Sequence, residues 1–154
     1  MNRNAKGKIF LTAFKISNFF TSKKILLIIG IPIRFTYKMI FQWILGIDIP
    51  DTVILGRNFQ VFHGQGLVIH KDVLIGDNVT VRHNTTIGVK NDGGMPPVIG
   101  DNVNIGANSV IIGSIKIGDN SIIAAGSVVV KDVPKKSVVA GNPARVIKMI
   151  NENS

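Results

Sequence analysis

Three histidines, His63, His70 and His83, are the side chains of this sequence best suited to moving protons near neutral pH. The chain of 154 residues has no cysteine, which excludes a disulfide framework, a thiolate metal site and a cysteine nucleophile. Histidines, carboxylates and backbone groups remain as the available chemistry. The histidines stand apart without clustered acids or thiols, so the sequence predicts no metal site.

Each histidine also has an interpretation without chemistry. His63 is followed by Gly64, and taken alone it is best explained as a surface residue at a corner of the chain. His70 has the same character. His83 follows Arg82, and it can line the same groove as His63 if the chain returns to the same place between the two. The elements that position these side chains therefore decide between the interpretations.

The body of the chain repeats every six residues. Ordinary strands repeat every two residues and helices every 3.6, so a sustained period of six with Gly-Asp-Asn corners predicts a parallel β-helix. Three hexads make one triangular coil of about 18 residues, in which the aliphatic residue of each hexad points inward. The two aliphatic series are Ile69, Ile75, Val81 and Ile87, and then Ile99, Ile105, Ile111, Ile117, Ile123 and Val129.

One stretch interrupts the repeat. The tetrapeptide IGDN begins at Ile75, Ile99 and Ile117; the last two lie one coil apart, whereas Ile75 and Ile99 are separated by one coil and one further hexad. The surplus hexad lies in GVKNDGGMPPV, at about 88–98, where paired glycines and prolines predict an extruded loop. The loop is either a tolerated insertion or a lid over a substrate site. Loops on rigid scaffolds often carry function, which favours the lid.

Charge separates residues 1–47 from the rest of the chain. This segment holds eight basic residues and no acidic residue, whereas 48–154 is nearly neutral. We therefore expect a basic, apolar helical segment at 1–47, the β-helix domain at 48–148 and a C-terminal tail at 149–154. The apolar run at 25–33 is too short to span a bilayer, and no cleavage pattern follows it, so a cytoplasmic protein is expected.

The basic segment has two possible roles that do not exclude each other. Apolar residues at helical spacing over 8–20 and 25–45 predict two or three helices, interrupted at Gly30 and Pro32. Trp43, Tyr37 and the phenylalanines can cap the open end of the β-helix, which solenoids require. Alternatively, the segment contacts the inner face of an anionic membrane. No nucleic-acid recognition motif is present, so nucleic-acid binding is not expected.

Four stretches of the chain closely resemble the left-handed β-helix, or hexapeptide-repeat, acetyltransferases, and within them the serine acetyltransferase branch. They are DIPDTVILGRNFQVFHGQGLVI, NTTIG, IGANSVIIGSIKIGDNSIIAAGSVVVKDVP and AGNPARVI. The last two carry the most specific part, AAGSVVVKDVP followed by GNPARVI. The resemblance implies an all-β, left-handed β-helix with a short α-helical N-terminal segment. It also implies a homotrimer with acetyl-CoA, the co-substrate, in the groove between neighbouring β-helices.

The resemblance implies that His63 is a general base supported by Asp48, fifteen residues earlier. This spacing is three short of a coil, so the two side chains can lie on adjacent coils within reach of each other. An imidazole titrates at about pH 6.5, and a carboxylate on its far nitrogen fixes the tautomer and stabilises the imidazolium. The acceptor hydroxyl then attacks the thioester directly, with a backbone amide available for the oxyanion.

The resemblance also places the cofactor. Small residues at Gly88, Ala107 and Ala125 let the pantetheine approach the backbone of the coils, although corner packing explains the alanines equally well. Lys131 and Arg145 are candidates for the CoA phosphates, because cations suit a polyanion. Lys131 is equally explained as a solvated surface charge.

The predicted acceptor residues are Phe62, His83 and Met95, and two of them depart from the serine enzymes. Those enzymes have an aspartate directly before the histidine and an Arg-His pair in the loop, where this chain has Phe62 and Met95-Pro96. A neutral acceptor such as a sugar hydroxyl suits these apolar replacements better, as in polysaccharide-biosynthesis acetyltransferases of the colanic-acid kind. A serine O-acetyltransferase and a non-catalytic β-helix scaffold or binding module are the alternatives.

Overall fold

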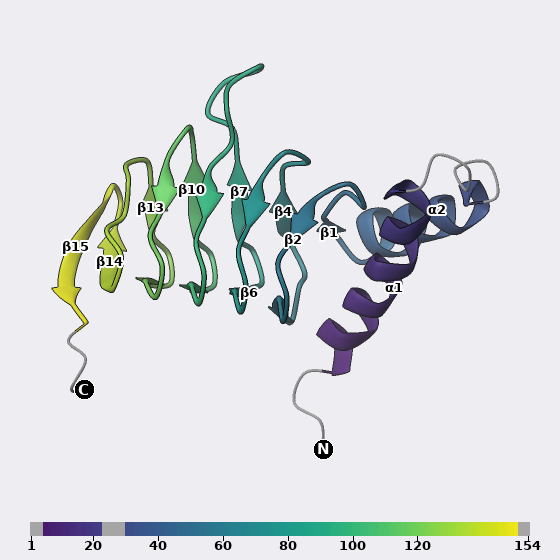
Figure 1. Ribbon diagram of the computed structural model, residues 1–154, viewed down its shortest axis with the longest axis horizontal. Coiled ribbons are helices and arrows are strands. Elements are labelled where there is room, and N and C mark those ends of the chain that lie inside the picture. The colour runs from purple at the N-terminus through teal and green to yellow at the C-terminus, as the bar shows by residue number, and fades with distance from the viewer. Residues whose placement is uncertain (1–4, 23–29, 151–154) are drawn as a thin grey trace.

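The computed structural model describes residues 5–22 and 30–150 (Figure 1). A helical cap lies at one end of a long parallel β-solenoid, and a hairpin closes the other end. Each coil of the solenoid contributes one short strand to each of three sheets, so strands far apart in the sequence are neighbours in space. The predicted β-helix is confirmed.

The three sheets run the length of the solenoid. All their strand pairs are parallel, except that β14 and β15 form an antiparallel hairpin. Sheet A contains β1 (Ile47–Asp48), β4 (Leu67–Ile69), β7 (Thr86–Gly88), β10 (Val110–Ile112) and β13 (Val128–Val129). Sheet B contains β2 (Ile54–Leu55), β5 (Leu74–Ile75), β8 (Val98–Ile99) and β11 (Lys116–Ile117). Sheet C contains β3 (Gln60–Phe62), β6 (Thr80–Arg82), β9 (Asn104–Ile105), β12 (Ile122–Ile123), β14 (Ser137–Gly141) and β15 (Ala144–Met149).

The core is a set of aliphatic ladders inside the triangular coils. Ile69 pairs with Ile87, Ile87 with Ile111 and Ile111 with Val129, and all four side chains are buried. Each ladder removes apolar surface from water, which stabilises the fold by about 25 cal/mol for each Å² buried. The period of six therefore places one residue of every hexad inside, as the sequence predicts.

The coil length varies along the solenoid, which corrects the expectation of a constant length of three hexads. Val110 pairs with Val128 and so closes a coil of three hexads, but the pairing of Ile47 with Leu67 makes a longer coil. The pairing of Ile122 with Val138 makes a shorter one. The pairing of Ile75 with Ile99 confirms the coil that is one hexad longer than the others. Its surplus forms a loop that projects from the solenoid between β7 and β8 (Figure 1).

Asparagine side chains hold the corners between sheets B and C. Asn58, Asn78 and Asn102 all have φ near +57°, a conformation that asparagine tolerates better than most residues. The Asn58 amide donates to Asn78 at 3.0 Å, and the Asn78 amide donates to Asn102 at 3.0 Å. These corners therefore stack in register from coil to coil.

An aromatic cluster joins the helices of the cap, which are α1 (Ala5–Ser22), α2 (Ile31–Tyr37) and the π-helix η2 (Lys38–Ile44). Phe10, Phe14, Tyr37 and Phe41 are buried together, with ring centroids 5.4 to 6.3 Å apart. Pro32 lies in the first turn of α2, where its missing N–H costs nothing, so it begins a helix rather than breaking one. Of the helix expected over 25–45, residues 25–29 lie outside the described part.

A buried carboxylate, Asp51, fastens the cap to the first coil. Its Oδ2 accepts hydrogen bonds from Ser17 (2.7 Å) and Thr21 (2.9 Å) of α1 and from Arg34 Nε (2.8 Å) of α2. Burial alone would raise the pKa of Asp51, but the hydrogen bonds from Arg34, Ser17 and Thr21 outweigh it and hold the pKa below its usual value. Asp51 thus stays charged and paired inside the molecule.

Tyr37, Phe10, Phe14 and Phe41 are buried in the cap at the end of the solenoid, as expected, but Phe19, Phe35 and Trp43 are exposed. The Tyr37 hydroxyl donates to the Ile49 carbonyl at 2.7 Å, whereas the Trp43 side chain is 76% exposed. The expectation that Trp43 is part of the cap's packing is therefore wrong, because it follows the buried Phe41 by two residues and so points away from the cluster. Within residues 5–22 and 30–150, no helix is long and apolar enough to cross a membrane.

Candidate active site

His63 occupies a corner between sheet C and sheet A. It follows β3 with φ +68°, its side chain is exposed, and its ring lies edge-on to the ring of His83, with centroids 5.9 Å apart. Phe62 pairs with Arg82, so His63 and His83 occupy the same place on consecutive coils. The structure therefore brings these two predicted site residues together.

Two small residues continue this corner into the next coils. Thr80 pairs with Asn104 and Asn104 with Ile122, which places Ala107 and then Ala125 after His83. The backbone confirms the stacking, because Asn108 N donates to His83 O (3.1 Å) and Gly126 N to Ala107 O (2.9 Å). We call His63, His83, Ala107 and Ala125 the histidine column. A Cβ added at the neighbouring Gly126 would meet no atom within 4 Å, so the alanine end of the column is open.

His83 and its neighbour Arg82 differ in their hydrogen bonding. His83 Nδ1 is buried and has no hydrogen-bond partner, whereas Arg82 donates to Asn104 Oδ1 (2.5 Å) and to Ile105 O (3.0 Å). The Arg82 guanidinium also lies 5.9 Å from the centre of the Phe62 ring. Buried polar nitrogens normally have a partner, so the lack of one at His83 Nδ1 is unusual.

Asp48, the predicted partner of His63, makes no hydrogen bond to it. It is exposed on β1 and pairs with Val68, five residues after His63, because the first coil is longer than three hexads. Among the described residues, no hydrogen bond or ion pair joins Asp48 to His63. The supporting role of Asp48 stays a prediction.

A shallow hollow on the outer face of sheet A contains two other predicted residues, Asp48 and Gly88. Its volume is about 350 Å³. A Cβ added at Gly88 would lie 3.8 Å from His70 Cβ, an ordinary contact, so packing within the chain does not require glycine there. The lining residues are Asp48, Pro50, Val68, Ile69, His70, Lys71, Thr86, Ile87 and Gly88.

His70 and Lys71 are members of this hollow that the sequence interpretation left as surface residues. His70 is half-buried, and its Nδ1 accepts a hydrogen bond from Asp72 N at 3.3 Å. His70 and Gly88 are three hexads apart, which is one coil, and this spacing is the signal that would have placed them side by side.

The extruded loop lies at the opposite edge of sheet A from the histidine column, where an edge is the line along which the strands of the sheet begin or end. The column precedes the strands of sheet A, whereas the loop follows β7 and runs past Gly113, whose N donates to Gly88 O at 3.1 Å. Met95, in this loop, is 71% exposed. The structure therefore does not bring Met95 and Gly88 together with His63 within one chain.

The predicted phosphate-binding cations are both exposed and lie apart. Lys131 follows β13, at the same edge of sheet A as Gly88, and Arg145 lies on β15 and pairs with Ala140. Both are near the hairpin end of the solenoid. Their role toward CoA stays a prediction.

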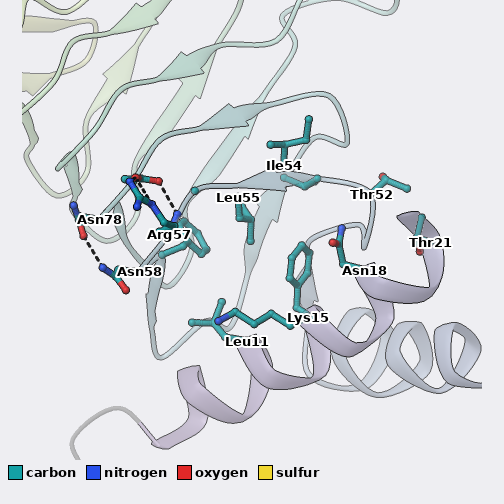
Figure 2. A pocket seen from close by; sticks show the side chains of 15 residues that line it. Leu11, Lys15, Asn18, Thr21, Thr52, Ile54, Leu55, Arg57, Asn58 and Asn78 are labelled. Atoms are coloured by element: carbon teal, nitrogen blue, oxygen red, sulfur yellow. Dashed lines mark hydrogen bonds and ion pairs between the residues drawn. The ribbon is translucent and has the colours of Figure 1, made fainter. Parts of the chain in front are cut away.

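A larger cleft, of about 910 Å³, separates α1 from the first coil at sheet B (Figure 2). Leu11, Lys15 and Asn18 of α1 face Ile54 and Leu55 across it. Arg57 at its margin is held by Asp77 (2.6 Å), and none of the predicted site residues lines it. Size alone would select this cleft, but it has no imidazole to act as a base, so we place the chemistry at the histidine column.

Comparison with known proteins identifies the family. Residues 96–131 match the family model described as bacterial transferase hexapeptide (six repeats). Over 116 residues the chain is 43% identical to the putative colanic acid biosynthesis acetyltransferase WcaB of Escherichia coli K12, covering 75% of this chain and 72% of WcaB. The chain belongs to the hexapeptide-repeat transferase family. Its relatives are named acetyltransferases, and the family's fold is the left-handed β-helix.

Serine acetyltransferases are further relatives of the chain. The chain is 43% identical to serine acetyltransferase 4 of Arabidopsis thaliana over 111 residues, which cover 71% of this chain and 31% of that protein. A crystal structure of serine acetyltransferase from Brucella abortus in complex with coenzyme A has a TM-score of 0.78 at 31% identity. That likeness covers 92% of this chain and 55% of the other. The chain thus spans only part of the serine acetyltransferases that it matches.

Proposed function

We propose that this protein is an acetyl-CoA-dependent O-acetyltransferase that uses His63 as the general base. The observation that carries the proposal is the histidine column, in which an exposed imidazole at a coil corner is continued by Ala107 and Ala125. The acetyltransferase names of the relatives and the coenzyme A complex of a structural neighbour support acetyl-CoA as the co-substrate.

The proposed reaction is a direct transfer of the acetyl group. The His63 imidazole takes the proton of the acceptor hydroxyl as its oxygen attacks the carbonyl carbon of the thioester, and a backbone N–H stabilises the oxyanion. The carbon–sulfur bond then breaks, and the CoA thiolate receives the proton from the imidazolium. Asp48 is the proposed positioning residue for the imidazole.

In this proposal, the histidine column and the sheet A hollow contact the pantetheine of the cofactor, and two exposed cations contact its phosphates. Ala107, Ala125 and Gly88 expose backbone that a pantetheine chain can reach, and the open space at Gly126 extends this surface. Lys131 and Arg145 are exposed cations near the hairpin end, where they can neutralise phosphates.

A homotrimer accounts for the separation of the predicted residues. His63 lies at one edge of sheet A, and Gly88 and Met95 lie at the other. A site that uses all three residues therefore needs edges from two chains, and a ring of three chains provides such a site at each contact.

Two acceptors remain, and each is favoured by a different observation. Serine is favoured by the comparisons, since most of the named relatives and the structural neighbours are serine acetyltransferases. A sugar hydroxyl is favoured by Phe62 and the exposed Met95, which give no charged group for an amino acid, and by the 72% of WcaB that the chain covers. The comparisons support serine at least as well as the sugar that the sequence interpretation prefers.

The general base is tested with His63→Asn. Asparagine tolerates the positive φ of this corner but accepts a proton too weakly to act as a base. We expect kcat/KM, measured as release of free CoA with an accepting substrate, to fall by about 100-fold or more. The matched control is Asn58→Gly, at another exposed corner of the first coil with φ +56°, which glycine adopts without strain, and this variant should retain activity. Unchanged turnover in His63→Asn would favour a scaffold or binding module instead.

The acceptor is tested by offering the purified wild-type protein free serine and a panel of mono- and oligosaccharides. Release of CoA with serine alone establishes the serine enzyme, and release with a sugar alone establishes carbohydrate acetylation. Mass spectrometry of the product identifies the acetylated hydroxyl. We expect a cytoplasmic acceptor in either case.

A further inference from the structure

The helical cap presents an unusual amount of apolar surface to solvent. The cap helices, together with Leu45 directly after η2, contribute ten of the twenty exposed large hydrophobic side chains found among the described residues, although they form only about a quarter of that part of the chain. Surfaces of this kind mark an interaction site in soluble proteins. The ten are Ile9, Ile16, Phe19, Ile31, Phe35, Met39, Ile40, Trp43, Ile44 and Leu45.

A groove of about 380 Å³ lies within this surface, between α1 and the α2–η2 segment. The Tyr37 hydroxyl on its wall is already bonded to Ile49 O, and its other polar side chain is Thr36, which donates to Pro32 O. The groove therefore offers hydrocarbon rather than hydrogen bonds to an occupant. Its lining residues are Ala13, Ile16, Pro32, Ile33, Thr36, Tyr37, Ile40 and Phe41.

Charge distinguishes between the possible partners of the cap. Residues 1–47 carry eight of the 18 basic residues of the chain and none of the nine acids. Among the described residues, no ion pair joins Lys6, Lys8, Lys15 or Lys38 to a carboxylate, whereas Arg34 is paired with Asp51. Two such caps facing each other would repel, so a second copy fits poorly. A layer of anionic headgroups complements the cap.

We propose that the cap docks on a membrane surface that contains anionic lipids. The groove and the exposed apolar side chains enter the boundary between headgroups and acyl chains, and the lysines contact the headgroups. Trp43 suits the interface because its indole combines apolar area with one polar N–H. The cap lies on the bilayer rather than crossing it.

Docking would bring the reaction corner close to the membrane. α1 packs against β3, and His63 follows β3 directly. Because the histidine column begins in the first coil, a docked cap holds it near the headgroups, where a lipid-linked acceptor would be presented. This consequence rests on the proposed function, whereas the docking itself does not.

Vesicle binding tests the proposal with the full chain. The protein is expected to co-sediment with vesicles containing about one third phosphatidylglycerol but not with pure phosphatidylcholine, and to dissociate as salt screens the headgroups. Lys6→Glu/Lys38→Glu, at exposed lysines of α1 and η2, should weaken the partitioning by at least about 10-fold. The control Lys116→Glu, an exposed lysine on β11, should bind as the wild type does.

Trp43 is the only tryptophan and reports insertion directly. Its fluorescence should shift to the blue and be quenched by brominated lipids in anionic vesicles only. Ile40→Ser/Ile44→Ser should abolish both effects while keeping the reporter, whereas Ile147→Ser, on β15 and also highly exposed, should not. Circular dichroism checks that each variant folds.

The same variant can also contradict membrane docking. Absence of a fluorescence shift, together with a smaller assembly for Ile40→Ser/Ile44→Ser in sedimentation velocity, would overturn the proposal and assign the surface to a second copy. Acetyl transfer to a water-soluble acceptor, measured without vesicles, should be the same in the wild type and in this variant. Loss of vesicle binding with intact transfer thus separates this proposal from the proposed function.

Discussion

At the scale of single residues, the contact between His63 and His83 is the feature with the most chemical content. The two rings are edge-on, with centroids 5.9 Å apart, and His83 Nδ1 is buried without a partner. The His83 ring therefore lies directly beside the proposed base. From this position we propose that it holds the acceptor through a hydrogen bond.

We therefore expect His83→Ala to act on the acceptor and not on acetyl-CoA. Loss of one hydrogen bond to a bound hydroxyl should raise the KM for the acceptor by about 10-fold and leave the KM for acetyl-CoA nearly unchanged. Initial rates with each substrate varied in turn measure the two constants. An equal change in both KM values would point to a structural role for His83, and His83→Gln, which keeps a donor, should partly restore acceptor binding.

At the scale of elements, Asp51 decides whether the cap stays attached to the solenoid. Its carboxylate receives hydrogen bonds from α1 and from α2 while its own backbone lies in the first coil. These hydrogen bonds join segments that are distant in the sequence and that the hexad pattern does not connect. The Asp51 carboxylate thus links the cap to the solenoid.

Asp51→Ala should destabilise the protein by about 3–5 kcal/mol, because it leaves Arg34 partly buried without its partner. Urea unfolding at pH 7 measures the loss. The folded pKa of Asp51 lies below its usual value, so its contribution is complete above about pH 3.9 and is lost as pH falls through the folded pKa. The difference between wild type and variant should therefore shrink in strong acid.

Asp72→Ala is the matched control for this prediction. Asp72 is exposed and lies 3.8 Å from His70 and from Lys71, contacts that contribute little at a solvated surface. Its replacement should leave the unfolding free energy within about 0.5 kcal/mol of the wild type. An equally large loss in this variant would show that the effect of Asp51→Ala is not specific to the buried site.

At the scale of the whole molecule, the predicted residues lie on different edges of sheet A. Gly88 and Met95 lie at one edge of sheet A, and His63 lies at the other. In the proposed trimer, one chain would supply one half of the site and a neighbouring chain the other. The proposed activity would then be a property of the oligomer.

Mixing two inactive variants tests this dependence. Gly88→Trp should block cofactor binding, and its Cβ makes only an ordinary contact, 3.8 Å from His70 Cβ. When Gly88→Trp and His63→Asn chains are refolded together in equal amounts, about a quarter of the shared sites are intact in a trimer. We expect about a quarter of the wild-type rate of CoA release. A mixture as inactive as its components would place both halves of the site in one chain.

The solenoid could be predicted without coordinates, because each hexad specifies its own inward residue and corner locally and then repeats. Ile99 to Val129 predict an inward ladder regardless of what the rest of the chain does, and the surplus hexad before Ile99 predicts the loop. The small residues at Ala107 and Ala125 could also be singled out, since they follow the same count.

The position of each functional residue relative to the others, in contrast, follows from tertiary packing. Corner lengths vary from coil to coil, so spacing alone could not place Asp48 opposite Val68, or His83 against His63. The Asp51 hydrogen bonds and the exposure of Trp43 depend on how helices pack against the first coil. Such contacts arise from the burial of side chains between distant segments, which no local period encodes.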